Sequence, residues 1–491
     1  MSQFMTAWMN PEQGFSFLSL RFLVFFMVLL ALCLRLDHRL QNRVLLGASY
    51  FFYAFWGPGY ALLLAAVTVF QYFCAGRIYR SQDPRLRKRY LFWSVAGGIG
   101  TLAVFKYVNF VVYGVLSLLG GAGVPVTPFW LGVLLPAGLS FYTFQTLSYT
   151  IDIYWRRAVP ADRFEDFALY VAFFPQLLAG PIERARSFLP QILKSRSVTA
   201  QDLREGAFLF FLGAYQKYFI ADNLAKHVGP FFESSGPYRG AEVLLMTYAF
   251  AFQLYGDFAG YSNMARGLGR CLGFDLMVNF NTPYLSRNPV EFWRRWHISL
   301  YSWIRDYVYV PLIYSPGKKD PRSIYTGTFV VMLLGALWHG VGLNYIFWGT
   351  FAALQIILYV LWRQRYPASE KFKAGLSGTF IHVFKVLAFF HLSVCMGWLI
   401  ARTSGPVQFM QMLKALLFRF AWLSSDSIFA GQILFCTWLL ILFEAAQYRW
   451  RNFWVLQKGP WQLRWAVYSV MAVSLLLLGD RSGRVFIYFQ F

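Results

Sequence analysis

The sequence is poor in charged residues, because Asp, Glu, Lys and Arg together make up only 14% of its 491 positions. Soluble domains carry about 25% charged residues, so this composition argues against a soluble enzyme. Hydrophobic residues make up 58% of the chain and recur in runs long enough for membrane-spanning helices. We therefore expect an all-α polytopic membrane protein whose residues 1–491 form a single membrane-embedded domain.

Acidic residues are particularly scarce. The chain holds 22 Asp and Glu against 45 Lys and Arg, which gives a formal net charge of +23. The basic residues gather in short segments between the apolar runs, and the densest of these segments is 77–89. Basic loops face the cytoplasm in inner-membrane proteins, so the sequence predicts a multi-pass protein of the inner (cytoplasmic) membrane. Since no nucleic-acid recognition module occurs in the sequence, we expect contact with membrane lipid and with no nucleic acid.

The sequence motifs of several common chemistries are missing as well. The five cysteines are isolated and form no CxxC or Cys/His pattern, so we expect neither a metal site nor a disulfide framework. No GxSxG nucleophile motif, P-loop or dinucleotide fingerprint occurs. A histidine base acting directly on a bound hydroxyl is then the simplest chemistry that the residues allow.

Two histidines stand out because each lies among tryptophans in a sequence that is otherwise typical of a membrane protein. His297 belongs to Phe-Trp-Arg-Arg-Trp-His-Ile-Ser-Leu at 292–300, and His339 belongs to Leu-Trp-His-Gly at 337–340. An ionisable group at membrane depth is costly and marks a candidate functional site. A lone intramembrane histidine is more often structural than catalytic. At His339, however, glycines on both sides would let backbone and substrate approach closely.

The spacing of residues around His297 predicts an amphipathic helix over 293–308 that lies at the membrane interface. His297 falls on its apolar face and would point into the protein or the bilayer. That face carries Trp293, Trp296, His297, Leu300, Trp303, Ile304, Tyr307 and Val308, and the polar face carries Arg294, Arg295, Ser299, Ser302, Arg305 and Asp306.

Three apolar runs contain residues that bear on the site. The run 324–362 is long enough for two short crossings, which would put His339 near the turn between them. The run 167–180 is too short for an easy crossing and contains Pro175 and Gly180, so we expect a re-entrant or broken element lined by protein. A run at 242–262 carries Asp257, for which a hydrogen bond between packed helices competes with a functional role. If successive apolar runs cross the membrane in alternating directions, the chain has about 11–13 spans.

Several motifs together resemble the membrane-bound O-acyltransferase family, and more narrowly its bacterial branch that acetylates alginate and D-alanylates teichoic acid. The most specific match is the segment 292–312, which is followed by Leu-Trp-His-Gly at 337–340. The sequence departs from the family pattern at three places, none of which includes either histidine: Glu183, Asn263 and the segment 313–320. Supporting matches follow one another along nearly the whole chain, at 105–110, 139–145, 174–182, 257–262 and 488–491.

The resemblance implies a ring of tilted helices around a central tunnel, with interfacial and re-entrant helices. The essential histidine of the family corresponds to His339, and its second conserved histidine corresponds to His297. Under this interpretation both are catalytic, and no metal takes part. Residues that would line the tunnel or contact substrate are Trp338, Trp296, Arg295, Ser299, Asp257, Gln176 and Tyr307.

The resemblance also implies an activity, that of an O-acetyltransferase in a bacterial inner membrane. The donor would be acetyl-CoA or another acyl thioester, with no bound cofactor. The acceptor would be an alginate-like polysaccharide outside the membrane, reached directly or through a periplasmic acetyltransferase partner. Acetylation of peptidoglycan or cellulose stays open, as does D-alanylation of teichoic acid from a carrier protein. A transporter or flippase predicts polar residues along several spans and an internal repeat, and the sequence has neither.

Overall fold

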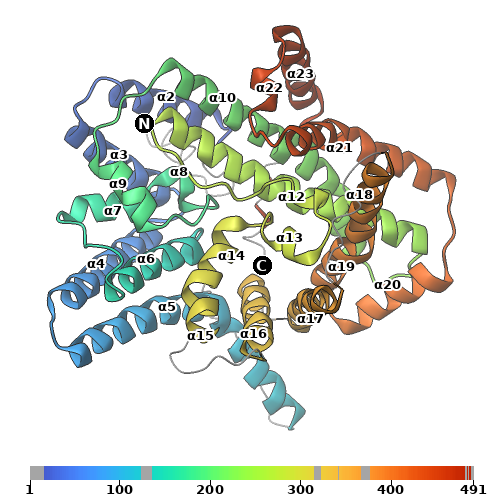
Figure 1. The fold of residues 1–491 in the computed structure, drawn as a ribbon, viewed down its shortest axis with the longest axis horizontal. Coiled ribbons are helices and arrows are strands. Elements are labelled where there is room, and N and C mark those ends of the chain that lie inside the picture. The colour runs from blue at the N-terminus through green and yellow to red at the C-terminus, as the bar shows by residue number, and fades with distance from the viewer. Residues whose placement is uncertain are drawn as a thin grey trace. The chain divides into compact units, whose positions relative to one another are not determined.

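The computed structural model describes residues 16–122, 135–313, 322–340, 342–366, 376–480, 484, 486 and 487. Within these ranges the chain forms helices joined by turns, and no strand occurs (Figure 1). The segment 314–320 and the terminal motif 488–491, which entered the family resemblance, lie outside the described residues. The chain divides into two compact units, Met1–Phe211 with Ser262–Met277 and Leu212–Tyr261 with Val278–Phe491.

The first unit contains the expected re-entrant stretch. Two short helices, α7 and α8, replace a crossing there, and every side chain from Phe167 to Glu183 is buried. The prediction of a broken element lined by protein is therefore confirmed. The helices of this unit are α2 (Leu20–Cys33), α3 (His38–Ala54), α4 (Pro58–Arg80), α5 (Pro84–Gly121), α6 (Leu139–Tyr154), α7 (Phe164–Ala172), α8 (Phe174–Leu177), α9 (Ala185–Leu193), most of α10 (Ala200–Ala214) and the end of α12 (Gly240–Cys271).

The long helix α5 shows how a local sequence sets a helix start. Asp83 precedes it, and its carboxylate accepts a hydrogen bond from the backbone N–H of Arg85 (2.8 Å). Pro84 then takes the first helical position, where its missing N–H costs nothing. In the most apolar 18-residue stretch of α5 only 6% is buried inside the protein, as expected for a helix that faces lipid.

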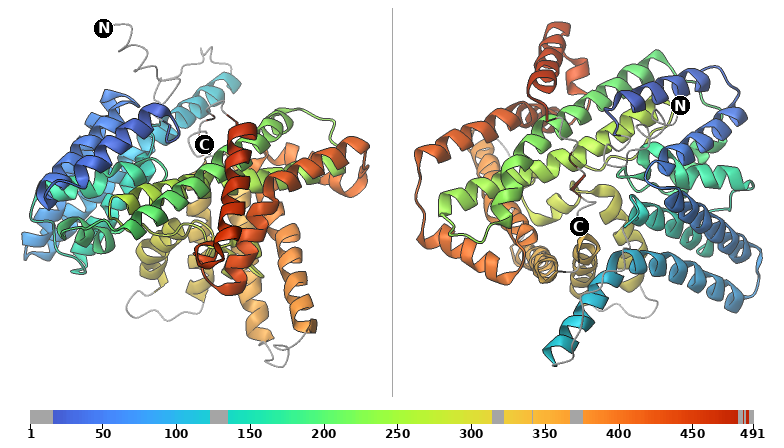
Figure 2. Two further views of the ribbon diagram at one scale, coloured as in Figure 1. Left: turned by 90° about the horizontal axis from the view of Figure 1, so that it is seen from above. Right: turned by 180° about the vertical axis from the view of Figure 1, so that it is seen from behind.

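The second unit holds both candidate histidines. Helices α16 and α17 form an antiparallel pair that lies side by side in Figure 1 and Figure 2. A Cβ atom at Gly349 would lie 2.8 Å from Ala336 Cβ, so the glycine permits their close approach. The other elements are η2 (Tyr215–Ala221), α11 (Asp222–Glu233), most of α12, η3 (Pro283–Leu285), α13 (Pro289–Trp293), α14 (Ile298–Ile304), η4 (Arg305–Tyr309), α15 (Val310–Ile313), α16 (Arg322–His339), α17 (Leu343–Arg365), α18 (Leu376–Phe389), η6 (Phe390–Val394), α19 (Cys395–Arg402), α20 (Pro406–Phe418), α21 (Ser424–Trp450), α22 (Val455–Lys458), α23 (Trp461–Val473) and η7 (Ser474–Leu478).

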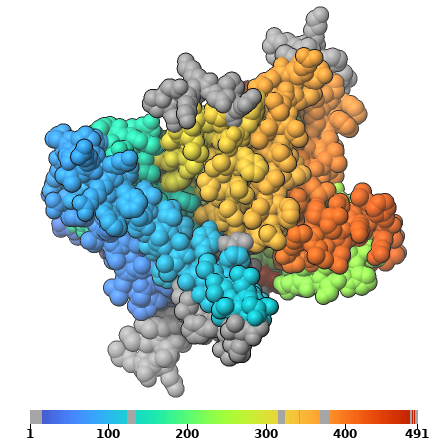
Figure 3. Space-filling model, turned by 90° about the horizontal axis from the view of Figure 1, so that it is seen from below, coloured from blue at the N-terminus to red at the C-terminus, as the bar shows by residue number. Residues whose placement is uncertain are grey.

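Six helical segments among the described residues are long and apolar enough to cross a membrane. The outer face of α17 carries large exposed apolar side chains such as Phe347, Leu358 and Trp362, and it belongs to the yellow-to-orange surface in Figure 3. The polytopic all-α class is thereby confirmed. A total of 11–13 crossings requires shorter helices such as α2 and α16 to cross as well, and it stays a prediction. The six segments are Pro58–Arg80, Pro84–Gly121, Leu343–Arg365, Phe380–Arg402, Ser424–Trp450 and Trp461–Leu478.

The continuous helix predicted over 293–308 is wrong. The chain there breaks into α13, α14 and the π-helical turn η4, and His297 lies in the break with φ +44°. Periodicity identified the buried face, since Trp296, Leu300 and Trp303 are buried, but it gave no sign of a reversal in the backbone. Ser299 was assigned to the polar face and is fully buried instead.

Candidate active site

His297 occupies a backbone conformation that is unusual for a residue with a Cβ atom. Its φ of +44° and ψ of +53° place it in the left-handed region, immediately before helix α14. Its carbonyl oxygen accepts hydrogen bonds from the N–H groups of Leu300 and Tyr301 (3.1 Å each). Asn279 holds the next turn, because its carbonyl accepts from Ile298 N (2.9 Å) and its side-chain oxygen accepts from Ser299 N (3.4 Å). Such backbone strain costs about 1–3 kcal/mol and is typical of functional sites.

The His297 imidazole is fully buried, with 0% of its surface exposed. Phe258 of α12 meets the ring edge-on, with ring centroids 4.5 Å apart. This burial lowers the pKa of His297 to about 3, because the charged imidazolium would lose its hydration. His297 is therefore neutral at physiological pH.

His339 ends helix α16, and 6% of its surface is exposed. The glycine that follows does not leave open space. A Cβ atom at Gly340 would lie 2.1 Å from Cε2 of Tyr345, so the tyrosine ring packs directly on the Gly340 backbone. Asn344, one residue earlier, donates from its side chain to the carbonyl of Ala401 (2.9 Å) and thereby ties α17 to α19. The glycine allows a tight, tied turn that fixes His339.

The two histidines are joined through one indole ring. Trp338 lies 5.7 Å from His297 and 4.6 Å from His339, measured between ring centroids. The contacts continue from His339 to Trp348 (5.1 Å) and from Trp348 to Trp398 (5.7 Å). We call His297, Trp338, His339, Trp348, Trp398 and Trp296 the aromatic–histidine cluster.

Trp296 closes this cluster, because its ring lies 4.8 Å from that of Trp398. Phe292 stacks on Trp296 at 5.6 Å and lines a small cavity of about 20 Å³ with Trp293, Trp348 and Trp398. A space of this size is close to that of a single water molecule. The cluster is thus tightly packed, and such apolar surroundings strengthen any electrostatic interaction inside it.

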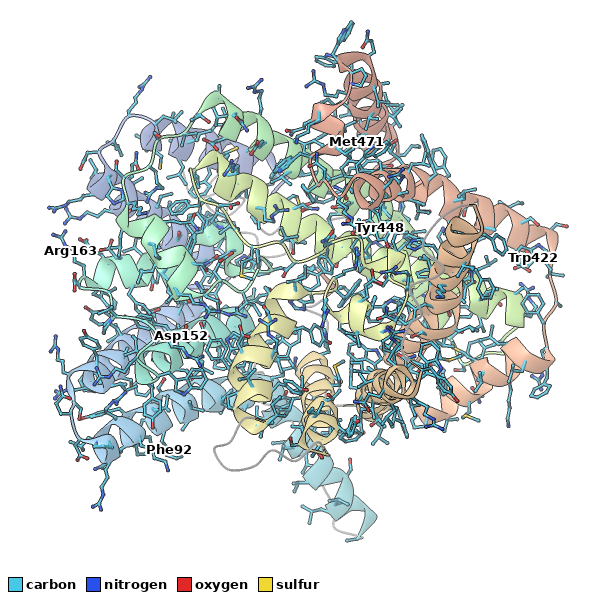
Figure 4. The ribbon with its side chains drawn as sticks, in the orientation of Figure 1. Phe92, Asp152, Arg163, Trp422, Tyr448 and Met471 are labelled. Atoms are coloured by element: carbon cyan, nitrogen blue, oxygen red, sulfur yellow. The ribbon has the colours of Figure 1, made fainter. Side chains whose placement is uncertain are left out.

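The other residues predicted for the site have the following contacts. Arg295 donates to Glu291 (2.9 Å) and to the Thr282 hydroxyl (2.8 Å), and its guanidinium lies over the ring of Tyr448, which Figure 4 labels. Tyr307 packs its ring on Trp303 (5.0 Å). Ser299 contributes its backbone to the turn after His297. Gln176 lies in the first unit, where its amide donates to the Tyr170 carbonyl (3.2 Å).

Asp257 belongs to a buried ion triad. The Lys217 ammonium lies 2.6 Å from Asp257 Oδ1 and donates to Asp222 Oδ1 (2.8 Å), and all three side chains are at most 4% exposed. Gly260 makes room for this pairing, since a Cβ atom there would lie 2.9 Å from the Lys217 backbone nitrogen. Asp257 Oδ2 also accepts from the N–H of Ile487 (2.7 Å), which fixes the chain near its C-terminal end. Because Phe258 follows Asp257 and contacts His297, the triad is linked to the cluster.

Sequence reasoning missed Lys217, Asp222 and a second buried acid, Glu444. The Glu444 carboxylate accepts a short hydrogen bond from the Tyr255 hydroxyl, and the Tyr255 ring lies 6.0 Å from Trp296. A lysine within an apolar run would have given the signal for the triad. Within the part of the chain that the structure describes, no three His, Cys, Asp or Glu side chains gather as metal ligands would.

Both histidines fall within the part of the chain that matches a known protein family. Residues 163–402 match the model of the membrane-bound O-acyltransferase family. The chain is 41% identical to a probable alginate O-acetylase of Pseudomonas aeruginosa, over 68% of this chain and 64% of that protein. It is 40% identical to the corresponding protein of Pseudomonas syringae pv. tomato, over 78% of this chain and 71% of the relative. A peptidoglycan O-acetyltransferase of Helicobacter pylori is 32% identical over 62% of this chain and 61% of its own length.

Proposed function

Because the chain belongs to the membrane-bound O-acyltransferase family, we propose that it is a membrane O-acetyltransferase. It would pass an acetyl group from a cytoplasmic thioester donor to hydroxyls of an alginate-like polysaccharide outside the membrane. The observation that carries this proposal is the aromatic–histidine cluster, whose buried imidazoles lie within the residues matched to the family. The chain spans about 64% of the length of the Pseudomonas aeruginosa relative, so the activity is inferred from shared residues.

In the proposed reaction His339 is the general base. Its neutral imidazole takes the proton of the acceptor hydroxyl while the hydroxyl oxygen bonds to the acetyl carbonyl carbon. The carbon–sulfur bond then breaks, and His339 returns the proton to the departing thiolate. The tryptophans around it exclude water, which would otherwise hydrolyse the thioester.

His297 would act on the donor carbonyl. A neutral imidazole carries one N–H, which can donate a hydrogen bond to the oxygen that gains negative charge during attack. The lowered pKa of His297 keeps it neutral, so it polarises the carbonyl without protonating it. Trp338 contacts both imidazoles and would keep their separation fixed.

The donor is proposed to be acetyl-CoA or another acyl thioester, with no resident cofactor. Basic residues at the end of α17, Arg363 and Arg365, would attract its phosphates on the cytoplasmic side. We propose an inner-membrane location, one catalytic domain over residues 1–491 and a tunnel ringed by helices. Support for one domain is that the matched residues, 163–402, belong to both compact units. A periplasmic acetyltransferase partner would complete delivery to the polysaccharide.

Peptidoglycan is the second acceptor that a specific observation favours, since the Helicobacter pylori relative is named for its acetylation. Mass analysis of envelope polysaccharides from cells with and without this protein separates the alternatives. We expect acetyl esters to disappear from an exopolysaccharide when the protein is absent. Loss of acetyl esters from peptidoglycan or cellulose would redirect the acceptor, and loss of D-alanyl esters would redirect the donor to a carrier protein. Unchanged esters on every polymer would contradict the proposal and favour a transporter or flippase.

A further inference from the structure

The second unit contains a cavity of about 440 Å³ that the proposed chemistry does not use. Its walls come from η2, α11, α12, the end of α19 and residues 484 and 487. A volume of this size is in the range of small-molecule sites. One wall is the buried ion triad of Lys217, Asp222 and Asp257.

Two acceptor atoms on the wall lack a hydrogen-bond donor among the described residues. Asp222 is 3% exposed, and its Oδ1 is bound by Lys217, but its Oδ2 is buried and receives no hydrogen bond. The side-chain oxygen of Gln253 is also buried and receives no hydrogen bond from the described residues. Buried acceptors that stay unbound are costly, so the geometry favours a ligand that brings O–H or N–H donors.

The charges on the cavity wall balance. Lys217, Arg402 and Arg484 face Asp222, Asp257 and Glu233. Lys217 is taken up by the triad, and Arg484 pairs with Asp480 (3.1 Å). Arg402 packs over the rings of Phe232 (5.3 Å) and Phe250 (5.9 Å) and makes no salt bridge with any described residue. The wall thus offers several acceptors and one available donor group, Arg402, and its positive and negative charges cancel. Such a wall suits a ligand that binds through hydroxyl groups rather than through a net charge.

The cavity lies at the end of the second unit that is away from its basic loops. Helix α17 ends in Arg363 and Arg365, whereas its first turn holds Asn344, which bonds to Ala401 next to Arg402. Similarly, Arg484 follows η7, at the opposite end of α23 from Arg464. By the positive-inside rule the cavity is on the extracytoplasmic side.

We propose that this cavity binds a sugar residue through its hydroxyl groups rather than through its charge. Asp222, Gln253 and Glu233 accept hydrogen bonds from the hydroxyls, and Arg402 donates to a hydroxyl or ring oxygen. The role of that sugar as part of the acetyl acceptor rests on the proposed function, whereas its binding does not. Asp257 connects the site to the cluster, because the next residue, Phe258, contacts His297.

Binding is measured by calorimetry on the full chain in lipid nanodiscs. The probes are a neutral mannose oligosaccharide and a mannuronate oligosaccharide of the same length, each at low and high salt. We expect both to bind with similar affinity and little dependence on salt. Gln253→Ala and Glu233→Ala each weaken binding at least tenfold because they remove an acceptor, and Asp222→Asn does so because it replaces an acceptor with a donor. The control is Glu242→Ala, which removes a carboxylate from α12 outside the cavity and leaves affinity unchanged.

Several results would overturn the proposal. They are the absence of binding by either sugar, binding of mannuronate alone that salt abolishes, and unchanged affinity in both Gln253→Ala and Glu233→Ala. Glu233 is exposed, so its variant tests the site even if Asp222→Asn fails to fold. A chain that binds both sugars but transfers no acetyl group would sink the proposed function and keep this site. Acetyl transfer by the Gln253→Ala variant with an unchanged KM for the acceptor would keep the proposed function and contradict this site.

Discussion

At the scale of single residues, His297 combines a strained backbone with a buried ring. Asn tolerates the left-handed region better than other residues with a Cβ atom, whereas a β-branched residue fits it poorly. His297→Asn should therefore fold but lose the hydrogen bond to the donor carbonyl, which lowers acetyl transfer about 10²-fold or more. His297→Val should in addition lower the unfolding free energy by about 1–3 kcal/mol. Thermal unfolding and transfer rates measured on both variants test this distinction.

Equal unfolding temperatures for the Asn and Val variants would contradict the role assigned to the backbone at this position. Wild-type transfer by His297→Asn would contradict the role assigned to the imidazole. The two readouts are separate, so the structural and chemical contributions of His297 can fail independently.

The same residue makes stability depend on pH. In the unfolded chain His297 titrates near its ordinary value of about 6.5, whereas burial lowers its folded pKa to about 3. Between these values the unfolded state binds more protons than the folded state. The contribution of the neutral His297 to stability is therefore fully present above about pH 6.5 and is lost as the pH falls toward 3. The largest slope from this one group is about 1.4 kcal/mol per pH unit. Unfolding measured from pH 7 to 5 should show a steeper loss for the wild type than for His297→Asn, and parallel curves would refute this assignment.

At the scale of elements, the turn between α16 and α17 depends on one glycine. A methyl group at Gly340 would overlap the Tyr345 ring, so Gly340→Ala should displace the ring and with it the end of α16 that carries His339. We expect a lower unfolding temperature and reduced acetyl transfer. The matched control is Gly431→Ala in α21, where nothing lies within 4 Å of the added atom. That change should stabilise the chain by up to about 1 kcal/mol, through helix propensity alone.

Partial recovery in the double variant Gly340→Ala, Tyr345→Leu would identify the ring contact as the cause. If Gly340→Ala behaves like Gly431→Ala in both assays, the turn does not position His339 in the way described.

The elements also show which features a sequence can predict. The run at 324–362 predicted two helices with His339 near their turn, because length and hydropathy determine crossings. The break at His297 could not be predicted, since periodicity reports faces and not backbone reversal, and positive φ is uncommon for any residue other than glycine. The triad was invisible for another reason. Lys217 and Asp257 are 40 positions apart in sequence, and their contact depends on the approach of two helices at Gly260.

At the scale of the whole molecule, composition and the long apolar runs together predicted the all-α polytopic class. A chain with 14% charged residues and long apolar runs has few alternatives to a helical membrane protein. The candidate site was found from chemistry as well as resemblance, because both histidines lie beside tryptophans in the sequence and meet the same tryptophan in space. The cavity and its ion triad required the structure, since Asp257 lies in a family motif but the side chains around it come from four separate elements.

The central claim is that His339 carries out acetyl transfer. The most direct measurement supplies labelled acetyl-CoA to everted membrane vesicles, which retain any periplasmic partner, and follows label into the polysaccharide fraction. Removing a general base lowers rates by about 10²–10⁴-fold, so vesicles with His339→Ala should lose most or all transfer at wild-type protein abundance. The control His391→Ala removes an exposed histidine outside the cluster and should transfer normally. Transfer by His339→Ala at the rate of the control would contradict the account.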